Sequence, residues 1–234
     1  MITLVLPIYN DAYNTKRNMQ KIIRKMNDLK RKFNESYEII VVEESTDSTP
    51  EIIKKFVTEN KNIRHMHYDK RLGKGGALKR GIMKSRGNKI LFMDIDLSTD
   101  IASVDKMVEK LDDYDIVAGS RFHPLSRVLR PYYRSCFGFG LSIIVRLLFG
   151  IPVKDTQCGF KGYRKEPIRR ILRIVKNNEW FWDIEVFYYA KKFSYNICEI
   201  PVSWKYNKLK SYGLFGNIFF YMKNILRFTI EKNS

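Results

Sequence analysis

Residues 89–100 read KILFMDIDLSTD, in which five residues suited to a buried strand lead directly to Asp94 and then, one residue later, to Asp96. In an extended backbone, alternate side chains point the same way about 6–7 Å apart, so two carboxylates repel unless a cation or a proton relieves them. Mg²⁺ and Mn²⁺ bind one or two carboxylates together with phosphate oxygens of a substrate. We therefore predict a metal site at Asp94 and Asp96; the alternative is that one of them caps the next helix.

Strands and helices are predicted to alternate around this stretch. Apolar runs indicate five strands, over residues 2–8, 37–44, 63–68, 89–94 and 115–120. Apolar residues spaced by three and four, together with capping residues, indicate helices over 15–33, within 45–60, and over 73–86 and 102–111. Because the connections are short, we expect βαβ crossovers, and the predicted fold class is α/β with a mainly parallel sheet.

Polar residues follow each predicted strand: Tyr9-Asn10-Asp11, Glu43-Glu44-Ser45, Asp69 to Gly76, Asp94 with Asp96, and Gly119-Ser120-Arg121. Parallel α/β sheets bind ligands beyond the carboxyl ends of their strands, so these residues are expected to meet in one site. Glu43 can accept from a ribose hydroxyl or a base N–H there. In GKGG, Gly73, Lys74 and Gly75 suit a backbone and helix N-terminus that approach a phosphate; the alternative is a plain glycine turn.

The chain has 234 residues and a formal net charge of +18. Such a charge favours nucleic acid, an anionic membrane surface or a phosphorylated small molecule as partner, with a solvated basic surface as the alternative. Three cysteines without a CxxC pair predict neither a zinc site nor a disulfide framework, and they suit a reducing compartment. His65 and His67 alternate on a predicted strand and His123 stands alone, so no catalytic triad is expected. Neither a signal peptide nor a transmembrane helix is expected.

The second half of the chain has a different composition. Its arginines suit a phosphate clamp or a solvated basic loop, at positions 121, 127, 130 and 134. The apolar tail 214–230 predicts an interfacial helix or a core helix, with a polar stripe of Asn217, Asn224, Arg227 and Glu231. We predict one continuous domain over 1–234, in which the second half, from residue 122, builds on the first, with an amphipathic helix over 211–234.

A set of motifs runs in order over nearly the whole chain: VLPIYND, VVEESTDST, RLGKGGALKRG, MDIDLST, VAGSRF, RSCFGFG, VKDTQCGFKGYRK, WFWDIEVFYYA and CEIPVSWKY. With these motifs the chain resembles the family 2 glycosyltransferases of the GT-A (Rossmann-like) fold, most closely the dolichyl-phosphate glucosyltransferases and polyprenyl-phosphate mannose synthases. DTQCGFK together with the acidic pair of WFWDIEV is specific to the lipid-phosphate branch. The chain departs from the family where it reads EESTDST in place of DDGSTDGT, which leaves the base and ribose contacts open.

The resemblance implies that residues 1–121 are a nucleotide-sugar-binding half and residues 122–210 an acceptor-side half. It also implies roles for individual residues. The donor nucleotide is held by the PxYN segment and the acidic end of the second strand, which are here Pro7, Tyr9, Asn10 and Glu43. Asp94 and Asp96 bind the metal on the sugar-nucleotide diphosphate, and Asp96 is counted as catalytic. Arg121, Arg134 and Ser135 contact the lipid phosphate or the leaving diphosphate. Asp155 matches a position proposed as catalytic, and Lys161 and Glu185 belong to motifs that line the site.

The expected reaction follows from these roles. A phosphate monoester is already anionic near neutral pH, since its second pKa is about 6, so it can attack without a strong general base. Asp155 then orients a phosphate-binding cation or the sugar. We expect metal-dependent, inverting transfer of a hexose, glucose being favoured, from a UDP-sugar to dolichyl or polyprenyl phosphate. The protein would be peripheral on the cytoplasmic, anionic face of a membrane.

Alternatives to this function remain open on the sequence alone. One is a polyprenyl-phosphate mannose synthase that uses GDP-mannose, and another is a family 2 enzyme with a saccharide acceptor. More remote alternatives are a basic nucleic-acid-binding module and an inactive relative that serves as a scaffold. No nucleic-acid partner is expected, because the carboxylates at the strand ends would repel phosphates without a metal.

Overall fold

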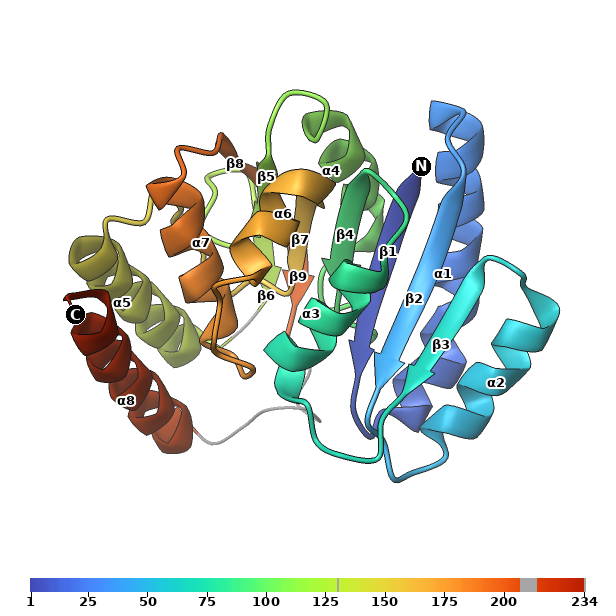
Figure 1. Cartoon of the computed structure of the whole chain (residues 1–234), viewed down its shortest axis with the longest axis horizontal. Coiled ribbons are helices and arrows are strands. Elements are labelled where there is room, and N and C mark those ends of the chain that lie inside the picture. The colour runs from blue at the N-terminus through green and yellow to red at the C-terminus, as the bar shows by residue number, and fades with distance from the viewer. Residues whose placement is uncertain (130, 207–213, 234) are drawn as a thin grey trace.

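The computed structural model describes residues 1–129, 131–206 and 214–233, except the side chains of residues 132–137, 214–215, 217–218 and 233. Its main sheet has seven strands in the order β3-β2-β1-β4-β7-β5-β8, and β6 and β9 form a separate pair (Figure 1). The strands are β1 (Ile2–Ile8), β2 (Tyr37–Glu43), β3 (Ile63–His67), β4 (Lys89–Met93), β5 (Ile116–Ser120), β6 (Arg127–Leu129), β7 (Phe160–Arg164), β8 (Ile197–Pro201) and β9 (Ser203–Lys205). The helices are α1 (Ala12–Phe33), α2 (Thr49–Glu59), α3 (Gly73–Lys84), α4 (Val104–Lys110), α5 (Tyr132–Phe149), α6 (Lys165–Leu172), α7 (Trp182–Lys192) and α8 (Leu214–Asn233), with a 3₁₀ turn η1 (Ile101–Ser103).

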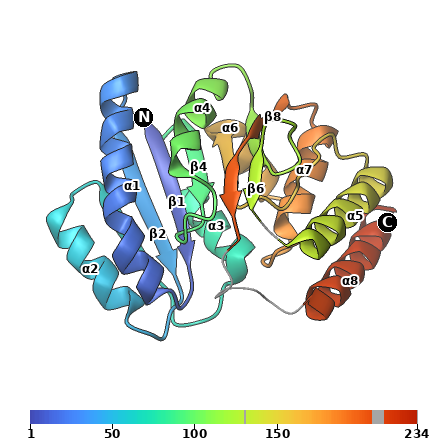
Figure 2. The ribbon, with the colours of Figure 1, turned by 180° about the vertical axis from the view of Figure 1, so that it is seen from behind.

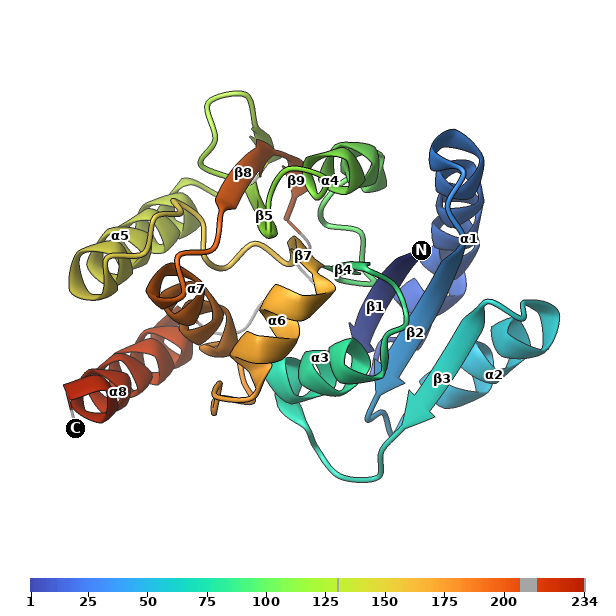
Figure 3. The ribbon, with the colours of Figure 1, turned by 45° about the horizontal axis from the view of Figure 1, so that its top comes forward.

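Helices cover both faces of the main sheet. α3, α6 and α7 lie on one face, and α1, α2 and α4 lie on the other (Figures 2 and 3). The inner strand β1 is mostly apolar because its successive side chains enter opposite cores: Leu4 and Leu6 face the α1 side, and Val5 faces the α3 side. The prediction of an α/β fold with a mainly parallel sheet is confirmed.

β7 is the one strand of the main sheet that runs antiparallel to its neighbours, β4 and β5. This strand was not predicted, because it lies outside the alternating pattern of the first half. Because β7 runs in the opposite direction, it begins at the rim where β4 and β5 end. The preceding loop, residues 151–159, is therefore brought to the rim at which the site was predicted.

α5 and α8 lie side by side at the end of the molecule opposite α2 (Figures 1 and 2). α8 buries Tyr221, Ile225 and Phe228, and the Phe228 ring lies 5.3 Å from that of Phe149 at the end of α5. Its other face leaves Leu226 exposed, along with further apolar residues. One face of α8 joins the core, as the core-helix alternative expects, and the interfacial role of the tail stays a prediction. Among the described residues, none of the helices is apolar over enough length to cross a membrane.

Candidate active site

A tight turn presents the DxD pair. β4 ends at Met93, and the N–H of Leu97 donates to the carbonyl of Asp94 at 3.2 Å, with Leu97 in the left-handed region at φ 52°. The side chain of Ile95 is buried, and its carbonyl accepts from Nδ2 of Asn18 at 3.0 Å. The extended geometry predicted for this stretch is therefore wrong. The two carboxylates are instead presented by a turn that is anchored through the residue between them.

Asp94 is held between two elements that lie far from it in sequence. Its Oδ1 lies 2.7 Å from Nζ of Lys74 in the first turn of α3. Its Oδ2 faces Gly159, where an added Cβ would lie only 1.9 Å away. Burial lowers the pKa of Lys74, but the carboxylates of Asp94 and Asp183 raise it overall, so the lysine is a cation here.

Asp96 has a local partner. Its Oδ1 accepts from the backbone N–H of Ser98 at 2.9 Å, which is the geometry of an Asx turn. Helix capping, the alternative considered for this pair, is performed by Asp100, whose side chain accepts from the N–H of Ala102 at 3.0 Å. Asp94 and Asp96 are the carboxylate oxygen donors of this turn, and 39% of the Asp94 side chain is exposed. Such a donor set fits a hard divalent cation such as Mg²⁺ or Mn²⁺.

Arg121, directly after β5, forms a two-pronged ion pair with Asp155 in the loop before β7. Nε lies 2.7 Å from Oδ2 and Nη2 lies 2.8 Å from Oδ1, and the backbone N–H of Arg121 also donates to Oδ2 at 2.8 Å. Only 12% of the Arg121 side chain and 1% of the Asp155 side chain are exposed. Burial raises the pKa of Asp155, but the Arg121 guanidinium lowers it below its usual range. Asp155 is therefore ionised and orients a fixed cation.

Lys161 of β7 is fully buried beneath the same rim. Its Nζ lies 2.8 Å from Oδ1 of Asp183, at the start of α7, and donates to the carbonyl of Cys158 at 2.6 Å. Burial raises the pKa of Asp183 even though Lys161 and Lys74 lower it. Of the acidic pair of WFWDIEV, only Glu185 was predicted to have a site role. Asp183 is a functional candidate that was missed, and its signal is an acid in the first turn of a helix otherwise rich in aromatic residues.

Glu185 lies away from the rim. Its carboxylate is buried, accepts from the backbone N–H groups of Lys176 and Asn177 at 2.8 and 3.0 Å, and lies 3.2 Å from Nη2 of Arg227. The structure therefore gives Glu185 a bracing role between α8 and the loop that precedes α7.

The glycines of GKGG are approached by the protein's own chain. A Cβ on Gly73 would lie 2.5 Å from the carbonyl oxygen of Asn178, and one on Gly75 would lie 2.6 Å from Cβ of Trp182. The N–H of Gly76 donates to the same Asn178 carbonyl at 2.9 Å. At Gly73 and Gly75 these contacts favour the plain glycine turn, since the protein's own chain occupies the space that a ligand would need. Within this motif, Lys74 is the residue that reaches the DxD pair.

The residues predicted to hold the nucleotide differ in their exposure to solvent. Pro7 lies in β1 and is half-buried, and Tyr9 is exposed, with the Arg71 guanidinium 3.6 Å from its ring centre. Asn10 accepts from the N–H of Thr46 at 2.8 Å and so ties the ends of β1 and β2 together. Glu43, in contrast, has a fully buried side chain. The structure does not bring its carboxylate to the open rim.

The predicted arginine clamp lies partly outside the described residues. Arg134 and Ser135 belong to α5, but their side chains lie outside the described part of the structure, as does the whole of Arg130. Arg127 is exposed on β6. Of the predicted arginine clamp, only Arg121 is therefore shown at the rim.

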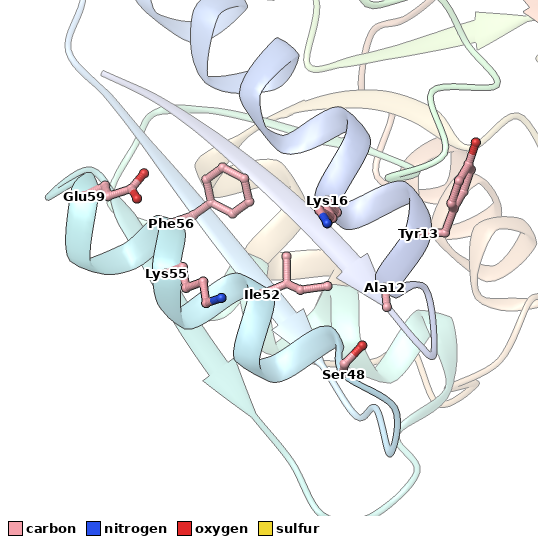
Figure 4. Close-up of a pocket in the computed structure, with 8 residues that line it drawn as sticks. All are labelled: Ala12, Tyr13, Lys16, Ser48, Ile52, Lys55, Phe56 and Glu59. Atoms are coloured by element: carbon pink, nitrogen blue, oxygen red, sulfur yellow. The ribbon is translucent and has the colours of Figure 1, made fainter.

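A surface pocket of about 580 Å³ lies between α1 and α2 (Figure 4). Residues of both helices and of the turn before α2 line it: Ala12, Tyr13, Lys16, Ser48, Ile52, Lys55, Phe56 and Glu59. None of them is among the predicted site residues, so this pocket does not bear on the assignment of the rim.

The fold is similar to that of solved nucleotide-sugar enzymes. Glucosyl-3-phosphoglycerate synthase from Mycobacterium tuberculosis, solved with UDP, gives a TM-score of 0.66 at 17% identity and covers 92% of this chain and 74% of that one. A mannosyltransferase from Pyrobaculum calidifontis, solved with GDP-Man and Mn²⁺, gives a TM-score of 0.57 at 17% identity, over 88% and 56% of the two chains. These similarities confirm the GT-A fold.

The sequence comparison is more specific. Residues 3–172 match glycosyl transferase family 2, and the chain belongs to this family. Glycosyltransferase AglD of Haloferax volcanii is 34% identical over 87% of this chain and 33% of its own length. Dolichyl-phosphate beta-glucosyltransferases of Dictyostelium discoideum and Homo sapiens are 34% and 32% identical over 87% of this chain and 66% and 67% of their own lengths. The chain thus spans a third of the first relative and about two thirds of the others, and the predicted family and enzyme class are confirmed.

Proposed function

We propose that this protein transfers a hexose, glucose being favoured, from a UDP-sugar to dolichyl or polyprenyl phosphate on the cytoplasmic face of a membrane. The names of the relatives support the acceptor and the sugar, since dolichyl-phosphate beta-glucosyltransferases match along 87% of the chain. The observation that carries the proposal is the buried Arg121–Asp155 pair, which fixes a cation at the same rim as the DxD turn. The rim thus has separate groups for a metal-bound diphosphate and for an acceptor phosphate.

The donor side is assigned to Asp94 and Asp96. Their carboxylates would hold Mg²⁺ or Mn²⁺, which neutralises the charge of a departing diphosphate. Tyr9 and Asn10 lie at the neighbouring strand end, where a nucleotide would extend. Lys74 is already paired with Asp94, so it can move from that carboxylate to a phosphate oxygen as the donor binds.

The acceptor side is assigned to Arg121. A guanidinium has five N–H donors, and Asp155 occupies those of Nε and Nη2 on one edge, so others stay available for a phosphate. The low pKa of Asp155 makes it a poor general base near neutral pH. A weak base at this position suits an acceptor phosphate, which is already an anion. Such an acceptor must be positioned, but no proton has to be removed from it.

Contact with a membrane is assigned to α5 and α8. Exposed apolar residues gather on these adjacent helices: Phe139, Ile143, Ile144, Leu147, Leu148, Phe219, Met222, Leu226 and Ile230. Arg146 and Lys223 are exposed on the same two helices, and the whole chain carries +18. An apolar surface with cationic residues matches an anionic bilayer, to which each cation near the surface adds about 1 kcal/mol.

The activity test uses purified protein, radiolabelled sugar nucleotides and polyprenyl phosphate, with extraction of the product into organic solvent. UDP-glucose should give an extractable product, EDTA should stop its formation, and Asp96→Asn should abolish it. Asp100→Asn is the matched control, because asparagine can still cap η1 and activity should be kept. Full activity of Asp96→Asn would refute the donor assignment. Product from GDP-mannose alone, or transfer only to a saccharide, would refute the proposed donor or acceptor.

The membrane test is sedimentation with anionic liposomes at low salt. Placing aspartate at both Leu147 and Leu226 should weaken partition about 10²-fold or more, since each buried leucine contributes about 1.5–3 kcal/mol. Met83→Asp changes an exposed apolar residue of α3 and should have no effect. Equal binding of the double variant and the parent protein would exclude α5 and α8 as the membrane surface.

A further inference from the structure

Two histidines and one glutamate meet at the edge of the main sheet, away from the DxD turn. His65 and His67 alternate on the edge strand β3, so their side chains point to the same face. Glu43 is in register with His67 on the neighbouring strand β2. One nitrogen from each histidine and one carboxylate oxygen lie within 4.8 Å of one another.

Both histidines turn a ring nitrogen toward one carboxylate oxygen of Glu43. Nε2 of His65 lies 2.8 Å and Nδ1 of His67 lies 2.5 Å from the same oxygen, Oε1 of Glu43. Four-coordinate Zn²⁺ with bonds of about 2.0–2.1 Å places its ligands roughly 3.3 Å apart. A zinc ion bound between the three groups therefore requires each nitrogen to move away from the oxygen by less than about 1 Å.

Neighbouring groups orient two of these three side chains. The other carboxylate oxygen of Glu43 accepts from the N–H of Ser45 at 2.7 Å, which fixes the plane of the carboxylate. Nε2 of His67 lies 3.2 Å from Oδ1 of Asp69, so Nδ1 is the nitrogen turned toward Glu43. A carboxylate on the far nitrogen of a histidine is the usual support for a metal ligand.

We infer that Glu43, His65 and His67 form a Zn²⁺ site that is separate from the Asp94 and Asp96 pair. Two imidazoles and one carboxylate suit zinc better than Mg²⁺, which favours oxygen ligands. Glu43 is closed to solvent, but the His67 side chain is 42% exposed and gives the ion a path to the centre. Three protein ligands leave a fourth position for water.

The site has a clear structural consequence. Zinc would join the end of β3, an edge strand, to the end of β2 through side chains as well as backbone hydrogen bonds. Oγ of Ser45, whose N–H holds Glu43, accepts from the N–H of Asn10 at 3.0 Å. The zinc site would thereby stiffen the part of the rim where the predicted nucleotide residues lie.

The test is direct measurement of zinc binding by the protein after removal of metal with EDTA. Titration with Zn²⁺ in competition with a chelator should give one tight site. His67→Ala should weaken it by about 100-fold or more, and Asp69→Asn, which removes only the orienting carboxylate, by about 10-fold. Zinc should also raise the thermal midpoint of the parent protein and have little effect on that of His67→Ala.

Two control variants separate this site from other zinc-binding groups. His123→Ala removes the third histidine of the chain and should leave zinc affinity unchanged. Asp94→Asn with Asp96→Asn should also leave it unchanged, although this variant loses transferase activity. The inference is overturned if no stoichiometric zinc binds, if His67→Ala binds zinc as tightly as the parent, or if affinity is lost in the aspartate variant.

Discussion

Replacing Asp155 with asparagine removes the charge that neutralises the buried guanidinium of Arg121. The side chains keep their shape, but the guanidinium no longer faces an anion across distances of 2.7 and 2.8 Å. Both side chains are nearly closed to solvent, so water cannot replace the lost partner without opening the rim. The perturbation is therefore electrostatic and lies at the assigned acceptor site.

The expected loss of stability is about 3–5 kcal/mol, the cost of removing one partner from a buried ion pair. This equals roughly 10²–10⁴-fold in the unfolding equilibrium constant, since about 1.4 kcal/mol is a factor of ten. Domains have a total stability of about 5–15 kcal/mol, so the variant should fold with a much reduced margin. The Asp28→Asn control breaks an exposed pair with Arg31 and should cost about 0–1 kcal/mol.

Urea unfolding followed by circular dichroism measures these differences as shifts in midpoint. A double variant, Arg121→Met with Asp155→Leu, should lose less stability than Asp155→Asn alone, because it removes both charges together.

The stability that Asp155 contributes to the folded protein decreases at low pH. The pKa of Asp155 is lowered in the folded protein, so its contribution is complete above the unfolded pKa of about 3.9 and is lost as the pH falls through the folded pKa. The difference in the free energy of unfolding between the parent and Asp155→Asn should therefore be constant from about pH 5 to 7. It should become smaller below about pH 4.

A loss below about 1 kcal/mol for Asp155→Asn, or a double variant less stable than the single one, would refute the reasoning. Either result would mean that solvent screens the pair and that Arg121 is not a fixed cation.

Three further predictions concern other parts of the site. Gly159→Ala should reduce transfer at least 10-fold with little loss of fold, because the new Cβ displaces the Asp94 carboxylate; Gly140→Ala, with open space around it, is the matched control, and equal activity of the two variants would contradict the contact. Cys158 should resist iodoacetamide near neutral pH until the protein unfolds, since burial raises the pKa of its thiol to about 11; peptide mass spectrometry would detect early labelling, which would count against this. Glu185→Ala should lower the free energy of unfolding by about 1–3 kcal/mol, because the buried N–H of Asn177 and the partly buried N–H of Lys176 lose their acceptor; an unchanged urea midpoint would contradict the bracing role.

Local pattern accounts for the first half of the fold. The strands β1 to β5 were predicted within about two residues of their observed limits, because each is a short apolar run between polar turns. Helix α1 follows from apolar residues on one side, although it begins at Ala12, three residues before its first predicted residue. β7 was not predicted, because FKGYR has no periodicity that separates a short antiparallel strand from a loop.

The sequence by itself determined the α/β alternation, the polar strand ends and the ordered motifs of the family, because hydrophobic periodicity and the order of residue types are local properties of the chain. Only the tertiary structure decided which of these residues meet. Asp155 reaches Arg121 because β7 is inserted antiparallel between β4 and β5, and Lys74 reaches Asp94 because α3 packs on β1 and β2 with its first turn next to the end of β4. Glu43 was expected to hold a nucleotide, yet strand register encloses it against the histidines of β3. Each of these contacts joins segments separated along the chain, and a long-range pairing depends on the register and packing of whole elements, which no local pattern encodes.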